Sequence, residues 1–278
     1  MAQQNDLVAG LYDRASPIYD QVGSRQFSRF GNRLVELMGI QPRASVLDVG
    51  VGRGANLFPA AKRVGPKGRV VGIDISQGML NEVDVAIRNM ALTQASVKQM
   101  DGAALDFADE TFDHLLCGYT IFWFNDLSQA LKGFHRVLRT DGSLGISMFG
   151  GGDPRWAWYE ELLRQYGDKY VKFTSLGGND VNGKPEVLRE ALRNSGFYDE
   201  RILIESFEIV QTSPEGWWEE KWAHGSRAAL EQMPPDIRDR FKTDAMAKLK
   251  EMEEDGVYRT KWNTCFAVAR KRQPQKRE

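Results

Sequence analysis

Cysteine and histidine are scarce in this sequence. The 278 residues include two cysteines, Cys117 and Cys265, and three histidines. Both cysteines lie in apolar stretches typical of strands, and neither has a CxxC partner. No cluster of aspartate and glutamate suggests a magnesium site either. The sequence therefore predicts neither a bound metal nor a redox motif.

An excess of one charge and long apolar runs are also absent. The formal net charge is −1, so we expect no basic surface of the kind that binds nucleic acid. No apolar run approaches the roughly 20 residues that cross a membrane. The first residues, MAQQNDLVAGLYDR, have neither the basic nor the apolar part of a signal peptide. These absences predict a cytoplasmic protein with no membrane span and no nucleic-acid partner.

Short apolar stretches alternate regularly with helical patterns in the first half of the chain. The expected strands span residues 45–49, 69–75, 95–100, 112–118 and 143–149. A rhythm of strand and helix indicates βαβ crossovers, which place helices on both faces of a parallel sheet. We predict an α/β, Rossmann-like fold with a mostly parallel seven-stranded sheet.

The segments on either side of this alternation have a different pattern. Helices are expected before it, with a break near Pro17, because proline ends a helix. After it the pattern is mostly helical, with one strand near 201–210. We expect one domain, residues 1–278, in four parts: N-terminal helices at 1–44, a core at 45–150, a mostly helical insertion at 151–258 and a last strand at 259–271.

The most informative stretch is VLDVGVGRG, residues 46–54. Its glycines let the backbone turn tightly and let a ligand approach the main chain closely. N–H groups at the start of the following helix can bind polar or anionic ligand groups. The glycines alone do not identify the ligand, because together with Ala55 they also satisfy the dinucleotide pattern G-x-G-x-x-G/A.

Carboxylates near this turn narrow the choice of ligand. Asp48 precedes Gly50 by two residues, where its charge would not help to bind a pyrophosphate but would compensate an ammonium group. Asp74 ends the next strand, and a carboxylate there can accept hydrogen bonds from both ribose hydroxyls. Asp101 and Gly102 follow the third strand at the same sheet edge. Each residue alone is also common in turns, so the prediction depends on the whole set.

Taken in order, these motifs resemble those of the Rossmann-fold S-adenosylmethionine (SAM)-dependent methyltransferases. The similarity is greatest to the branch of quinone-biosynthesis C-methyltransferases and natural-product methyltransferases. It covers residues 45–150 and rests on VLDVGVGRG, VVGIDIS, QMDGAALDFADETFDHLLC and FHRVLRTDGSLGISMF. The resemblance implies an enzyme that uses SAM as its cofactor and methylates a small-molecule acceptor, with residues 45–150 as its SAM-binding core.

The resemblance also implies roles for individual residues. Gly50, Gly52 and Gly54 would hold the methionine part of SAM, with Asp48 contributing through the loop. Asp74 would hold the ribose.

Further positions follow from the same resemblance around the adenine and the sulfonium. The adenine would be surrounded by Ile75, Met79, Asp101, Gly102 and Ala103. Cys117, Gly118 and Tyr119 would lie near the sulfonium. An N-terminal tyrosine often covers SAM in this family; Tyr19 is the first candidate for it, also as a catalytic residue, and Tyr12 is the second.

The acceptor side is less well defined by the sequence. His224 lies in the helical insertion and is the candidate catalytic base, which is needed only if the acceptor must lose a proton. His114 and His135 are expected to be structural. The aromatic residues that gather in these regions predict an apolar pocket under a helical lid, with core packing as the alternative: Phe122, Trp123, Phe124, Trp156, Trp158, Trp217, Trp218 and Trp222.

The leading prediction is methyl transfer to carbon or oxygen of a small hydrophobic or aromatic acceptor. One alternative is a SAM-binding enzyme of this fold that catalyses cyclisation or decarboxylation. Others are a non-enzymatic nucleotide-binding module and an NAD oxidoreductase, which Asp48 disfavours. The insertion could also form the interface of a homo-oligomer, because tryptophan is enriched at interfaces.

Overall fold

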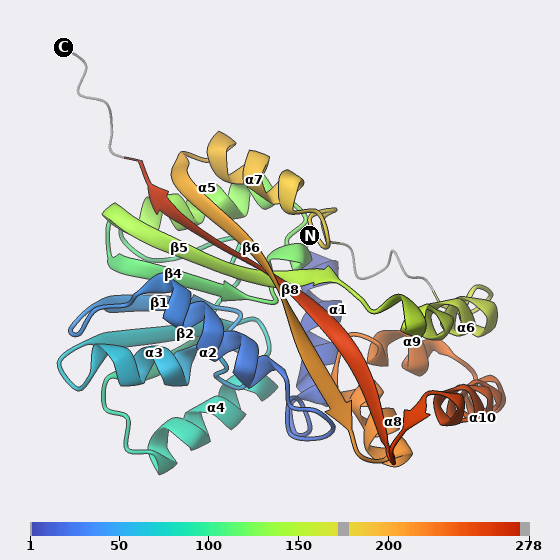
Figure 1. Ribbon diagram of the computed structural model, residues 1–278. Coiled ribbons are helices and arrows are strands. Elements are labelled where there is room, and N and C mark those ends of the chain that lie inside the picture. Colours follow the sequence, from blue (N-terminus) through green and yellow to red (C-terminus); the bar gives the residue numbers. More distant parts are fainter. Residues whose placement is uncertain (1, 172–177, 273–278) are drawn as a thin grey trace.

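The computed structural model describes residues 2–171 and 178–272 (Figure 1). Its sheet has the strand order β3-β2-β1-β4-β5-β8-β6, and a further short strand, β7, pairs with β8. The strands are β1 (Ser45–Val49), β2 (Arg69–Asp74), β3 (Ala95–Gln99), β4 (Phe112–Gly118), β5 (Leu138–Gly151), β6 (Phe197–Gln211), β7 (Glu253–Glu254) and β8 (Val257–Lys271). Strands β1 to β5 pair in parallel, and β8 is antiparallel to both β5 and β6. The predicted mostly parallel α/β sheet is confirmed, with β7 in addition to the seven expected strands.

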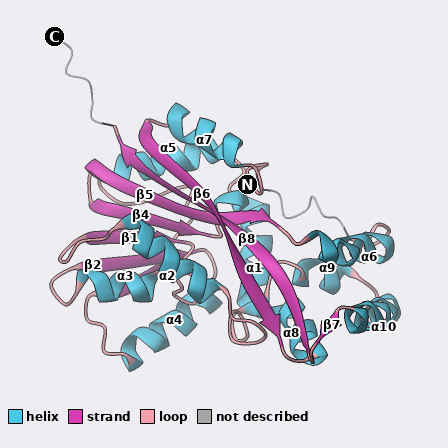
Figure 2. Cartoon of the chain, in the orientation of Figure 1, coloured by secondary structure: helices cyan, strands magenta, loops and turns pink. Residues whose placement is uncertain are grey.

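Helices cover both faces of this sheet (Figure 2). The α-helices are α1 (Ala2–Ala15), α2 (Phe27–Met38), α3 (Leu57–Val64), α4 (Gln77–Asn89), α5 (Leu127–Val137), α6 (Ala157–Gly167), α7 (Pro185–Asn194), α8 (Pro214–Ala223), α9 (Arg227–Gln232) and α10 (Pro235–Glu251). Two short 3₁₀ helices are η1 (Ile121–Trp123) and η2 (Pro154–Trp156). Side chains cap the starts of α4, α5 and α8, because Ser76 accepts a hydrogen bond from the Met79 N–H, Asp126 from the Gln129 N–H and Ser213 from the Gly216 N–H.

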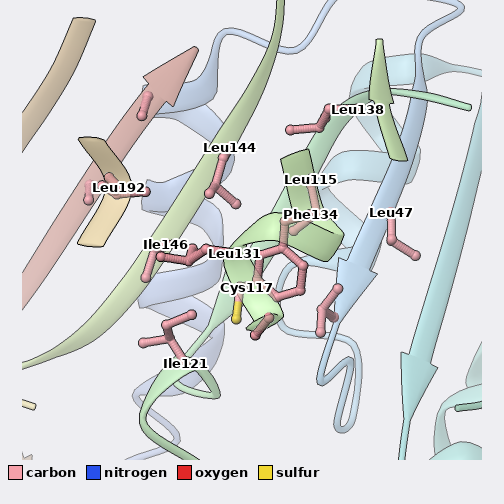
Figure 3. Close-up of a cluster of buried hydrophobic side chains, with 14 of the residues drawn as sticks. Leu47, Leu115, Cys117, Ile121, Leu131, Phe134, Leu138, Leu144, Ile146 and Leu192 are labelled. Atoms are coloured by element: carbon pink, nitrogen blue, oxygen red, sulfur yellow. The ribbon is translucent and has the colours of Figure 1, made fainter. Parts of the chain in front are cut away.

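Each face of the sheet has its own apolar core. On one face, Leu131 and Phe134 of α5 pack with Leu192 of α7 against the strands (Figure 3). On the other face, the fully buried Leu34 of α2 and Leu57 of α3 pack against the strands. These two cores bury most of β1, β2 and β4 from both sides, which is why these parallel strands are mainly apolar.

Strands β6 and β8 are long enough to leave the sheet and carry a second group of helices. Both run past the neighbouring strands as an antiparallel pair toward α6, α8, α9 and α10 (Figure 1). We call these four the insertion helices. They enclose a third apolar cluster, which includes Trp217, Trp218, Leu230, Phe241 and Leu249.

Only part of the expected insertion at residues 151–258 stands away from the sheet. Helix α7 lies within that range but belongs to the sheet, since its Leu188 and Leu192 are buried in the core that α5 also covers. The insertion helices are therefore the part of this range that stands away from the sheet.

Helix α1 connects the sheet with the insertion helices. Asp13 Oδ1 accepts hydrogen bonds from Ser76 Oγ at 2.6 Å and from the Gly78 N–H at 2.8 Å, both at the start of α4. On its other side, Arg14 forms an ion pair of 2.6 Å with Glu231 of α9. The helix ends at Ala15, close to the break expected near Pro17. Helix α1 is thus held across the carboxyl edge of the parallel strands.

Candidate active site

The glycine loop after β1 has a backbone that other residues adopt only with strain. Gly50, Gly52 and Gly54 have φ angles of 71°, 51° and 89°. A Cβ atom on Gly50 would lie 2.1 Å from Thr120 Oγ1, and one on Gly54 would lie 2.4 Å from the Phe58 ring. The loop therefore requires glycine for its shape and for its close contacts.

The N–H groups of these glycines already have partners within the protein. Gly50 donates to the Ile73 carbonyl at 2.9 Å, and Gly54 donates to the Val51 carbonyl at 2.8 Å. Gly52 donates to Asp74 Oδ2 at 2.9 Å. These three N–H groups therefore hold the loop in shape. The glycines serve the tight turn and the close approach of a ligand to the main chain.

A cavity lies over this loop at the carboxyl edge of the sheet. Most residues expected to bind the cofactor line it: Tyr19, Gly50, Gly52, Asp74, Ile75, Met79, Asp101, Gly102, Gly118 and Tyr119. They come from the ends of four strands and from the segment after α1. We call this space the cofactor cavity.

Asp74 combines a structural role with a position in the cofactor cavity. Its two carboxylate oxygens accept hydrogen bonds of 2.9 Å from the N–H groups of Ser76 and Gly52. Burial raises the pKa of Asp74, and these N–H donors oppose that rise. Because each carboxylate oxygen has more than one lone pair, Asp74 can still accept hydrogen bonds from a ligand.

Asp101 faces helix α1 across the cofactor cavity. Its Oδ2 accepts a hydrogen bond of 2.8 Å from the Asn5 amide, and its Oδ1 accepts one of 2.8 Å from the Ala103 N–H. Asn5, Val8 and Tyr12 of α1 also line the cavity. The sequence reasoning missed Asn5 and Val8, although their spacing from Tyr12 places all three on one helix face.

Four expected cofactor residues are not among the lining residues of the cofactor cavity: Asp48, Gly54, Ala103 and Cys117. Asp48 is fully buried, and its Oδ1 accepts a hydrogen bond of 3.0 Å from Asn56 while its Oδ2 has no partner. Burial raises the pKa of Asp48 to about 7. Cys117 is buried in the sheet core, and Ala103 serves as the N–H donor to Asp101. For Cys117 the structure shows a packing role.

A second and larger cavity, of about 920 Å³, adjoins the first. The two share Tyr12, Tyr19, Tyr119 and Trp123 as lining residues. A volume of this size lies within the range of small-molecule sites, about 300–1,000 Å³. Because its walls include the insertion helices, we call it the outer cavity.

The expected aromatic residues divide between the cavities and the apolar cores. Phe122, Trp123, Trp156 and Trp217 line the outer cavity, and Phe124 lines the cofactor cavity. Trp158, Trp218 and Trp222 line neither cavity and pack within the third apolar cluster. The pocket and the packing interpretations are each correct for part of the set.

His224 and Tyr19 meet where the two cavities join. Their ring centroids are 5.6 Å apart, and each ring also contacts Phe27. Burial lowers the pKa of His224 to about 4 and raises the pKa of Tyr19 well above its ordinary value. At neutral pH both side chains are therefore uncharged, so His224 can accept a proton and Tyr19 keeps its own.

Tyr119 forms the wall between the cavities and is held by hydrogen bonds from β8. Its hydroxyl accepts a hydrogen bond of 2.8 Å from Trp262 Nε1 and lies 2.7 Å from Thr264 Oγ1. Its backbone has a φ of 52°, which is uncommon outside glycine. The two partners fix the ring at the junction.

Comparison with known proteins decides the family. A family model described as a methyltransferase domain matches residues 46–142. Nocamycin O-methyltransferase of Saccharothrix syringae is 31% identical, and the match covers 94% of this chain and 98% of that protein. The chain belongs to the methyltransferase family.

Two further matches place this methyltransferase among its relatives. Aklanonic acid methyltransferase DauC of Streptomyces sp. strain C5 is 34% identical over 50% of this chain and 64% of that protein. The crystal structure of the [4+2]-cyclase SpnF has a TM-score of 0.60 at 19% identity and covers 97% of both chains. The second match shows the shared fold alone. The methyltransferase is an enzyme whose cofactor is SAM, as the resemblance of its motifs implied.

The described residues of the methyltransferase contain no group of three or more His, Cys, Asp or Glu side chains that could hold a metal ion. In the same residues, no helix has the length and apolarity to cross a membrane. His114 bonds Ser143 Oγ at 2.7 Å, and His135 packs against Phe197, so both have structural partners.

Replacing Asp74 by alanine should weaken the binding of S-adenosylhomocysteine at least about tenfold, because hydrogen bonds to a charged acceptor contribute roughly 1.5–3 kcal/mol each. Isothermal calorimetry measures the affinity. Asp84→Ala is the control, since Asp84 is exposed on α4 and pairs with Arg88. Unchanged affinity in a folded Asp74→Ala protein would contradict a role in cofactor binding.

The buried carboxyl of Asp48 should make stability depend on pH. Its pKa is raised from 3.8 to about 7 in the folded protein, so its contribution to stability is full below pH 3.8 and is lost as the pH rises through 7. In Asp48→Asn the side chain does not ionise, so this loss of stability does not occur. Urea titrations without cofactor measure the free energy of unfolding. Between pH 4 and 7, this free energy should rise in the variant relative to the wild type by up to about 4 kcal/mol. A constant difference across this range would show that Asp48 ionises freely.

Proposed function

We propose that this methyltransferase transfers the methyl group of SAM to an oxygen atom of a small hydrophobic acceptor bound in the outer cavity. The observation that carries this proposal is the junction of the two cavities at Tyr12, Tyr19, Tyr119 and Trp123. A molecule in the outer cavity meets the cofactor cavity at these shared residues. In-line transfer depends on holding the two reactants close and aligned.

The residues of the cofactor cavity fit SAM. In our proposal Gly50 and Gly52 give the methionine part close access to the backbone, and Asp74 accepts hydrogen bonds from the ribose. Ile75 and Met79 pack on the adenine, near Asp101. Bound SAM supplies an activated methyl group. The buried, partner-free Oδ2 of Asp48 lies behind the loop and favours a cationic ligand over a phosphate.

Oxygen is the acceptor atom that the outer cavity favours. His224 is neutral and lies at the junction beside Tyr19. A base with a pKa of about 4 is weak and suits an acidic hydroxyl, such as an enol or a phenol beside a carbonyl. The names of the two relatives, an O-methyltransferase and a methyltransferase of an acid, agree with this choice.

In this proposal His224 accepts the acceptor's proton as its oxygen takes the methyl group. Tyr19 and Tyr119 hold the acceptor at the junction, because the pKa values of both hydroxyls are raised by burial and neither ionises. Tyr19 is thus a positioning residue and not the base.

We further propose that the insertion helices act as a lid on the outer cavity. Trp156, Tyr159 and Leu163 come from η2 and α6, and Trp217 comes from α8. These side chains cover the acceptor with apolar surface and keep water away from the sulfonium. Helix α7 has no part in this lid.

Incubation with methyl-labelled SAM and a panel of hydroxylated naphthoquinones and anthraquinones tests the function. We expect label in an O-methylated product and one S-adenosylhomocysteine per product. His224→Gln should lower kcat by about 10²-fold, and the wild-type kcat should show no inflection near pH 6.5 because His224 titrates near 4.

A changed acceptor without label would identify cyclisation or decarboxylation instead. Label on carbon would overturn the oxygen assignment, and a wild-type kcat in His224→Gln would exclude that residue as the base.

The lid is tested by a matched pair of tryptophans. Trp156 and Trp158 are both partly buried, and their ring centroids are 5.9 Å apart, but only Trp156 lines the outer cavity. Trp156→Ala should raise the acceptor KM about tenfold through lost aromatic contact, and Trp158→Ala should not. Affinity for S-adenosylhomocysteine should stay the same in both. Equal KM values for the two variants would count against the lid.

A further inference from the structure

Lys221 is a charged side chain in the apolar part of the outer cavity. It lies in the last turn of α8 and lines the cavity. Its Nζ is 4.6 Å from the centroid of the Trp217 ring and 5.2 Å from that of Tyr159. Aromatic faces attract an ammonium group but accept none of its three N–H donors in a full hydrogen bond.

The other charged groups of the outer cavity do not neutralise Lys221 directly. Among the described residues, no carboxylate oxygen lies within ion-pair distance of its Nζ. The acidic side chains that line the cavity have other partners. Asp153 pairs with Arg155 at 2.8 Å, and Glu160 pairs with Arg164 at 3.6 Å.

Glu220 precedes Lys221 in the chain but is turned to different partners. Its Oε2 accepts hydrogen bonds of 3.0 Å from both the N–H and the Oγ of Ser24, and another from Gln211. Burial lowers the pKa of Lys221, and the charge of Glu220 opposes this. An anion bound at Nζ would favour the charged ammonium and supply the missing hydrogen-bond acceptor.

We propose that the acceptor carries a carboxylate and that Lys221 binds this group between Trp217 and Tyr159. The inference rests on the proposed function for the location of the acceptor. It adds the class of acceptor: an aromatic acid whose flat apolar body spans from Lys221 to the junction at His224. Lys221 is then the residue that selects acids over neutral molecules of the same shape.

The end of α8 supports this arrangement. Lys221 lies in the last turn of α8, His224 directly follows the helix, and both line the outer cavity, so one molecule in this cavity can contact both side chains. Arg164 and Lys261 also line this cavity but are exposed to solvent, where water screens their charges. Lys221 is therefore the cation of this cavity whose apolar surroundings allow it to select for an anion.

A binding experiment with a matched pair of probes tests the proposal. Anthraquinone-2-carboxylate and anthraquinone-2-carboxamide have the same shape and differ in charge. Quenching of tryptophan fluorescence, with S-adenosylhomocysteine present, gives both dissociation constants. We expect the wild type to bind the acid at least about tenfold more tightly than the amide, as hydrogen bonds between charged groups imply.

Variants then assign this preference to a residue. Lys221→Met should lose the preference for the acid and keep its affinity for the amide within about threefold, which also serves as the check on folding. Lys221→Arg should retain most of the preference, and Lys261→Met should retain all of it. If the methionine variant does not fold, Lys221→Gln provides the same comparison.

Three results would overturn the inference: equal binding of acid and amide by the wild type, a preference that survives in Lys221→Met, or no binding of either probe at millimolar concentration. None of these measurements involves methyl transfer. If the preference for the acid is not found, the proposed methylation is unaffected. If an acid binds through Lys221 but the protein never transfers label, only the proposed function is contradicted.

Discussion

The hydrogen bond between the Asp74 carboxylate and the Gly52 N–H joins two segments that line the cofactor cavity. It connects the end of β2 to the loop that follows β1. The other oxygen of Asp74 holds the Ser76 N–H, and the Ser76 hydroxyl in turn donates to Asp13 of α1. One partly buried carboxylate thus sets the shape of the glycine loop, the start of α4 and the position of the helix that covers the cavity. Because a buried charge is costly unless several donors surround it, this arrangement has little freedom to change.

The second cavity depends on the length of two strands rather than on any motif. β6 and β8 continue beyond β5, and their far ends place α8 and its neighbours across from the cofactor cavity. A separate apolar cluster holds the insertion helices together. The cavity between this cluster and the sheet is therefore a gap between two packed bodies that share a continuous antiparallel pair. Such a design lets the acceptor side vary while the cofactor side is preserved.

An ionisable group without a full set of partners lies near each cavity: Asp48 is buried beside the glycine loop, and Lys221 lines the outer cavity. Asp48 has a carboxylate oxygen without a partner, and Lys221 has an ammonium without a carboxylate, each in apolar surroundings. Such groups reduce stability in the absence of a ligand. Their opposite charges match the cation and the anion that we assign to the two cavities. His224 lies between them at the junction and is kept neutral by burial.

The sequence by itself determined the sheet, its strand-end motifs and the family, because alternating strands and helices and the glycine loop are local patterns. It placed Asp74 and Asp101 at one edge, since parallel strands end at the same side of a sheet, whereas Tyr19 followed only from the family resemblance. Only the tertiary structure decided which side chains face a cavity. Cys117 and Trp218 proved to be core residues, and Asn5 and Lys221 proved to face cavities. The physical reason is that burial, free hydrogen-bond donors and shifted pKa values arise from elements far apart in the chain, here α1, β8 and α8, which no local pattern brings together.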